Sequence, residues 1–156
     1  MSNVLIGIIG VILFIGLALA GALYLGPRFS QSANDSEAAR YISEGQQISR
    51  AFELYGLNEG KFPDGDGETD ADSNKRILTQ MVKKGYLKSV PQGSKSGTAP
   101  SWYVDSDKGA AMTSIGAGDG SKGVCESARR QAGFTDAVKE CGASDIVDKD
   151  PCCKVA

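Results

Sequence analysis

The sequence contains no histidine, so no imidazole is present to activate a serine or a cysteine as a nucleophile. No glycine-rich phosphate-binding motif leads into a helix, and no pair of acidic residues flanks a recognisable cleft. We therefore predict no enzymatic activity. The formal net charge of -2, from 17 basic and 19 acidic residues, provides no basic surface for nucleic acid.

Charge is also missing from the start of the chain, where no basic residue precedes Arg28 and no acidic residue precedes Asp35. Val4 to Leu25 reads VLIGIIGVILFIGLALAGALYL, which as a helix spans about 33 Å and so crosses a hydrocarbon layer of about 30 Å. Ala18-Leu19-Ala20 is similar to a signal-peptide cleavage site, but the apolar run is too long and no basic region precedes it. We interpret the run as a retained transmembrane helix.

Two features of the sequence predict opposite membrane orientations for this helix. Arg28 follows the apolar run, so the positive-inside rule places the rest of the chain in the cytoplasm. The even number of cysteines near the C-terminus predicts an oxidising compartment instead. Removal of a short basic leader before Met1 would reconcile the two, and we hold this as a hypothesis.

Small residues recur through the apolar run at intervals that let two helices approach closely. Each glycine also weakens a helix by about 1 kcal/mol relative to alanine. One alternative is that glycine is simply common in membrane helices. Our prediction is that the following residues pack against other helices in a filament: Gly7, Gly10, Gly16, Ala18, Gly21 and Ala22.

Gly26-Pro27 is expected to interrupt the helical pattern as a kink or a locally melted stretch, because proline lacks a backbone donor and disfavours helix in the residue before it. An amphipathic helix then resumes, with one apolar stripe and one polar face. We expect the polar face to be solvated or to face another subunit, and it carries Asp35, Glu37, Arg40 and Arg50. The apolar stripe consists of Tyr41, Ile42, Ile48, Phe52 and Tyr55. This divides the chain into residues 1–26 (transmembrane or filament-core helix), 27–56 (amphipathic half) and 57–156 (globular head).

The head is predicted to hold short helices and a short antiparallel sheet, which gives an α+β fold class. We expect a helix over Lys75–Gly85 with Gly85 as its C-cap, and strands at Ser101–Asp105 and Ala110–Ile115. A further helix is expected over Val124–Gln131, ending at Gly133. Gly116–Gly123 is expected to form a loop. Trp102 in the first strand is expected to be a core residue rather than part of an adhesive patch.

Four cysteines lie in the last part of the head: Cys125, Cys141, Cys152 and Cys153. Their spacing does not match a zinc site, so disulfides are favoured over a metal site and over buried free thiols. Three connectivities are open. A bond between the adjacent Cys152 and Cys153 would strain the backbone, which favours Cys125 and Cys141 each pairing with one of them.

An acidic cluster lies between the long helix and the next one. Its alternating carboxylates could bind a hard cation such as calcium, but the spacing does not match an EF-hand, and a solvated acidic loop is the main alternative. No other cofactor is predicted. The cluster consists of Asp64, Asp66, Glu68, Asp70 and Asp72.

This layout resembles the type IV pilin family, with the type II secretion pseudopilins as relatives. The motifs that carry the resemblance are Tyr55-Gly56, Phe62-Pro63, Ile77-Leu78, Gly85-Tyr86-Leu87 and Pro91. A cysteine within Val124–Gly133 and others near the C-terminus look like the larger type IVb heads. The chain departs from the family at Leu5, where pilins usually carry a glutamate that pairs with a neighbour's N-terminal amine.

The resemblance implies a structural subunit of an extracellular type IV pilus-like filament. Such a chain is stored in the bacterial inner membrane, passed to an inner-membrane assembly machinery and polymerised with copies of itself on the cell surface. Its role could be adhesion, motility, DNA uptake or secretion. The alternative is a non-polymerising, single-pass periplasmic module that binds a ligand or calcium.

Overall fold

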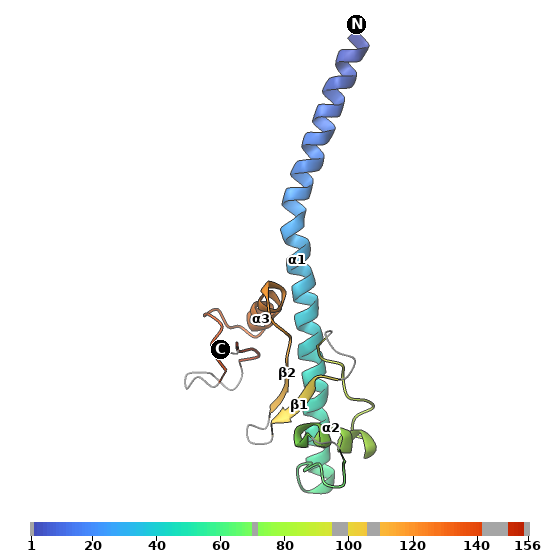
Figure 1. Cartoon of the computed structure of the whole chain (residues 1–156), viewed down its shortest axis with the longest axis vertical. Coiled ribbons are helices and arrows are strands. Elements are labelled where there is room, and N and C mark those ends of the chain that lie inside the picture. Colours follow the sequence, from blue (N-terminus) through green and yellow to red (C-terminus); the bar gives the residue numbers. More distant parts are fainter. Residues whose placement is uncertain (1, 70–71, 95–99, 106–109, 142–149, 155–156) are drawn as a thin grey trace.

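The computed structural model describes residues 2–69, 72–94, 100–105, 110–141 and 150–154. One helix, α1 (Ser2–Glu59), runs the length of the molecule, and the other elements gather around its C-terminal part (Figure 1). They are α2 (Ser73–Lys83), β1 (Trp102–Asp105), β2 (Ala110–Thr113) and α3 (Asp119–Gln131). The predicted α+β fold, a long helix packed on a small disulfide-linked head, is confirmed.

Of the two forms predicted for the interruption at Gly26-Pro27, the locally melted stretch is wrong, because both residues are helical within α1. Proline removes one backbone hydrogen bond but leaves the turns on either side intact, and the ribbon in Figure 1 bends without uncoiling. The Ser30 hydroxyl donates to the Pro27 carbonyl at 3.0 Å, on the C-terminal side of the proline. α1 also continues to Glu59, past the predicted boundary at residue 56.

The main hydrophobic core lies between α1, α2 and the sheet. The α1 stripe predicted from the sequence supplies Ile48 and Tyr55, which are 0% and 1% exposed, and half-buried Tyr41 and Phe52 pack against the same core. Ala51 of α1 belongs to this core as well, and Ala38 of α1 packs with Val124 and Ala128 of α3 in a second cluster, although the apolar pattern singled out neither alanine. The other core side chains come from α2, the segment after it and β1: Ile77, Leu78, Met81, Leu87, Trp102 and Val104.

Two glycines end the short helices of the head. After α2, Gly85 has a φ of +80°, and the amide of Tyr86 donates to the carbonyl of Met81 at 3.0 Å. After α3, Gly133 has a φ of +85°, and the amide of Phe134 donates to the carbonyl of Arg129 at 2.9 Å. Both are Schellman caps, in which glycine adopts the left-handed conformation that other residues avoid. The predicted helix ends are therefore confirmed.

The two predicted strands pair with each other as an antiparallel sheet, with Trp102 opposite Thr113 and Asp105 opposite Ala110. The prediction of a loop up to Gly123 is partly wrong, because α3 begins at Asp119. Asp119 lies in the first turn, where a carboxylate interacts favourably with the helix dipole, and this compensates for the glycines that follow.

Candidate functional site

The N-terminal part of α1 is a helix against which no other described element of the chain packs. Its large apolar residues from Val4 to Leu25 are between 48% and 79% exposed, and the segment is long and apolar enough to cross a membrane. In Figure 1 it projects away from the head as an isolated rod. A surface this apolar is not stable in water, so it has to be covered by lipid or by other protein.

The glycines of this rod are not required by the chain's own fold. A Cβ atom added to Gly7, Gly10, Gly16 or Gly21 would meet no other atom within 4 Å. Gly26 is equally open. Since each glycine weakens the helix, their frequency fits a surface that is meant to let a second helix approach closely. The structure brings no other helix to these residues, so the predicted packing role stays a prediction.

Glu44 joins the head to α1. Its carboxylate accepts hydrogen bonds from the Trp102 indole nitrogen at 2.7 Å and from the Gly93 amide at 3.0 Å, and it pairs with Arg40 at 3.1 Å. Arg40 also donates to the Gly93 carbonyl at 2.9 Å. The network therefore connects a turn of α1 to β1 and to the segment before it. The prediction that Arg40 lies on a solvated or subunit-facing surface is wrong.

The packing of α3 on α1 uses small and polar residues. Gly123 lies against the Asn34 side chain, where a Cβ atom would come within 2.3 Å of the Asn34 amide nitrogen. The Asp35 carboxylate accepts hydrogen bonds from the Ser127 hydroxyl and, at 3.0 Å, from Arg130. The predicted polar face of the amphipathic helix therefore faces the head at Asp35. This contact marks the first turn of α1 at which the head packs.

The two disulfides connect Cys125 to Cys152 and Cys141 to Cys153, which is the favoured arrangement in which each of the earlier cysteines takes one of the adjacent pair. No cysteine is left free. The first bond attaches the C-terminal segment to α3. The two disulfides thereby stabilise the C-terminal part of the head, which has few apolar residues.

Arg129 is the buried charge beside the disulfides. It is 2% exposed, and its Nε lies 3.0 Å from an Asp150 carboxylate oxygen, while its Nη2 lies 2.8 Å from Asp136. The hydrogen bonds to Asp150 raise the pKa of Arg129 above its ordinary value. Arg129 thus holds the C-terminal segment on α3, whereas its neighbour Arg130 pairs with Asp35 of α1.

The acidic loop is tied to α2 and to nearby lysines. Asp64 accepts hydrogen bonds from Lys61 at 2.8 Å and from the Gln80 side chain at 3.2 Å, and Glu68 lies 2.6 Å from Lys83. Within the described residues no three acidic, cysteine or histidine side chains form a group that could hold a metal ion. Asp70 lies outside the described residues. Calcium binding by this cluster therefore stays a prediction.

Asp64 makes the stability contributed by this loop depend on pH. The hydrogen bonds from Lys61, from the Asp66 amide and from Gln80 hold the pKa of Asp64 well below its usual range. A carboxylate whose pKa is lower in the folded than in the unfolded state stabilises the fold at pH values above its unfolded pKa of about 4. This stabilisation is lost as the pH falls through the folded-state pKa. We expect Asp64→Asn to lower the melting temperature near neutral pH, with the deficit shrinking below about pH 4. Melting curves of both proteins across this range test it, and a deficit that does not change with pH contradicts it.

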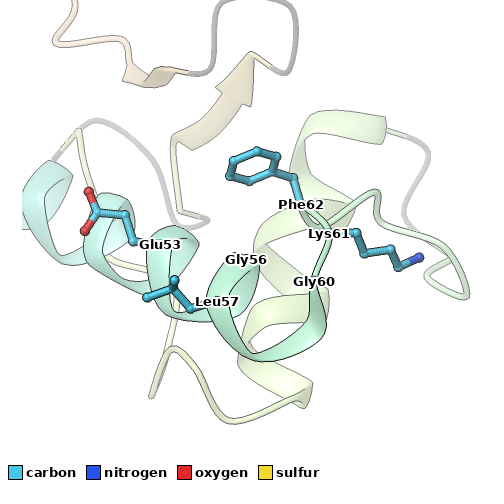
Figure 2. A pocket seen from close by; sticks show the side chains of 6 residues that line it. All are labelled: Glu53, Gly56, Leu57, Gly60, Lys61 and Phe62. Carbon is cyan, nitrogen blue, oxygen red and sulfur yellow. The ribbon is translucent and has the colours of Figure 1, made fainter.

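A shallow hollow lies at the far end of α1 from the N-terminus (Figure 2). Leu57 and Phe62 are 81% and 72% exposed there, and the Phe62 ring lies over Gly56. In the close view the Lys61 side chain extends away from Leu57. The hollow combines this apolar surface with two charged lining residues, Glu53 and Lys61. Its lining residues are Glu53, Gly56, Leu57, Gly60, Lys61 and Phe62.

Comparison with known proteins finds no match to this chain among family models, curated proteins or solved structures. Two features of the chain therefore indicate its function. One is the exposed apolar rod of α1, and the other is the head that the same helix carries, which disulfides and buried ion pairs stabilise.

Proposed function

We propose that the chain is a structural subunit of an extracellular, type IV pilus-like helical filament. The observation that carries the proposal is the apolar rod, whose open glycines face no other part of the chain and which has to be covered by something else. In the precursor state lipid of the bacterial inner membrane covers it. In the filament the rods of neighbouring copies cover one another, after transfer by an inner-membrane assembly machinery.

The transfer is energetically accessible. A rod that leaves lipid for a bundle of like rods stays among apolar groups, so it loses little of the favourable burial free energy. Small residues then permit backbones to approach, and dispersion contacts between helices supply the gain. The heads lie outside this bundle, where their disulfides suit an oxidising environment.

Cross-linking between copies tests this proposal. Ala18→Cys introduces a single free thiol, since all four native cysteines are paired. We expect brief exposure to a short, membrane-permeant, thiol-reactive cross-linker to convert this variant to covalent dimers in material sheared from the cell surface. The matched control is Ser89→Cys, an exposed position of the head, which we expect to stay largely monomeric.

Two results would count against the proposal. Ala18→Cys chains found only as monomers in the membrane fraction would favour the single-pass periplasmic module. Equal cross-linking of both variants would show association without packing of the rods.

A further inference from the structure

The apolar rod ends in residues suited to the surface of a bilayer. Tyr24 and Phe29 are 68% and 71% exposed, and the guanidinium carbon of Arg28 lies 5.9 Å from the centre of the Tyr24 ring. Tyrosine is enriched at the headgroup level of membranes, and arginine extends its charged end into that level while its stem stays in apolar surroundings. We call Tyr24, Arg28 and Phe29 the interfacial collar.

The length of the rod places the collar at the headgroup level. Val4 to Leu25 spans about 33 Å of helix, against a hydrocarbon thickness of about 30 Å. Pro27 indicates the same depth, because its nitrogen cannot donate to the Leu23 carbonyl. A carbonyl without a donor is costly in hydrocarbon, whereas water among the headgroups can satisfy it.

Arg28 has no acidic partner among the described residues of the chain. The acidic groups that follow it on α1 are engaged with other cations: Asp35 pairs with Arg130 at 3.0 Å, and Glu37 lies 3.7 Å from Arg40. The head packs on α1 only from Asn34 onward, and residues 30–33 between the collar and the head are exposed. The Arg28 guanidinium is therefore open to an anion supplied by the bilayer.

We propose that the interfacial collar binds the phosphate of an anionic phospholipid while the chain is anchored in the membrane. The planar guanidinium of Arg28 donates to the phosphate oxygens, and the Tyr24 and Phe29 rings lie among the headgroups beside it. This binding fixes the depth of α1, so that the head begins about 7.5 Å of helix beyond the collar. The inference rests on the membrane-anchored stage of the proposed function and does not require assembly.

Lipid selectivity of the full chain tests the collar. The chain is reconstituted at low salt in phosphatidylcholine vesicles that contain a trace of spin-labelled phosphatidylglycerol or spin-labelled phosphatidylcholine, and the motionally restricted fraction of each label is measured. We expect about fivefold preference for phosphatidylglycerol, the effect of one basic residue near the surface. Arg28→Gln should abolish it. Arg50→Gln removes the same charge from an exposed position about 33 Å further along α1 and should leave the preference unchanged.

The other outcomes overturn either the collar or the membrane stage of the proposed function. No preference in the wild-type chain, or a preference that survives in Arg28→Gln, overturns the collar. Equal loss in Arg50→Gln also overturns it, because net charge would then be sufficient. Flotation of the vesicles in alkaline carbonate is measured first, since a chain that does not float contradicts the membrane stage of the proposed function itself. A chain that floats but shows no lipid preference contradicts the collar alone.

Discussion

Replacing Gly16 by leucine is expected to abolish filaments while leaving the chain in the membrane. Among the described residues a Cβ atom at Gly16 meets nothing within 4 Å, and the neighbouring large side chains of this part of α1 are exposed, so a leucine has open space to occupy. Leucine is also a better helix former than glycine, by up to about 1 kcal/mol, so insertion should be undiminished. In a bundle, however, the larger side chain holds neighbouring backbones apart and removes the close contact.

The measurement compares two fractions of the same cells. Immunoblots should show Gly16→Leu in carbonate-washed membranes at the wild-type level, and a decrease of at least tenfold in the sheared surface fraction. Ala18→Leu should act in the same direction. Leu17→Ile, a neighbouring change that conserves volume, should assemble normally. Wild-type amounts of sheared Gly16→Leu would show that this glycine does not pack in the filament.

Replacing Glu44 by alanine is expected to destabilise the head by about 3 kcal/mol. The change leaves the Trp102 indole N–H and the Gly93 amide without their acceptor and removes the ion-pair partner of Arg40. Loss of one member of a buried charged network costs several kcal/mol, because the remaining groups stay desolvated. The Glu44 side chain is 14% exposed, which places the expected cost toward the lower end of that range.

Chemical denaturation of the detergent-solubilised chain, followed by fluorescence, measures this effect. Trp102 is the only tryptophan, so its emission reports on the network directly. Glu44→Gln keeps an acceptor oxygen and should recover part of the stability. Glu53→Ala, an exposed acid on the same helix, should change the unfolding free energy by less than about 0.5 kcal/mol. Equal effects of Glu44→Ala and Glu53→Ala would show that the network does not hold the head.

Local signals in the sequence predicted most elements of the fold. Gly85 and Gly133 marked helix ends because a left-handed residue is nearly always required there. The adjacency of Cys152 and Cys153 reduced the three possible disulfide connectivities to two, one of which is observed. Each of these signals acts over a few residues, which is why a single sequence is enough to reveal them.

The contacts between distant polar residues could not be predicted in the same way. Glu44 and Trp102 are 58 positions apart, and nothing in their local patterns indicates that they meet. Asp35 looked solvated because helical periodicity separates apolar from polar residues, and it cannot tell a polar residue that binds α3 from one that faces water. The start of α3 was missed for a similar reason, since Gly118, Gly120 and Gly123 indicated a loop.

The apolar rod was evident from composition, but its continuity through Pro27 was not. Proline disfavours helix in an isolated segment, whereas the many hydrogen bonds of a long helix on both sides tolerate the loss of one. α1 is consequently a single continuous element. The N-terminal apolar rod and the C-terminal part of α1, around which the head packs, therefore form one helix.

Electron cryomicroscopy of material sheared from cells that express the full chain tests the central claim most directly. The account predicts filaments with a core of closely packed helices that fit residues 4–25 of many copies, surrounded by heads joined to that core through continuous α1 helices. Filaments whose core is not built from this segment, or a chain found only as a monomer in the membrane, would contradict it.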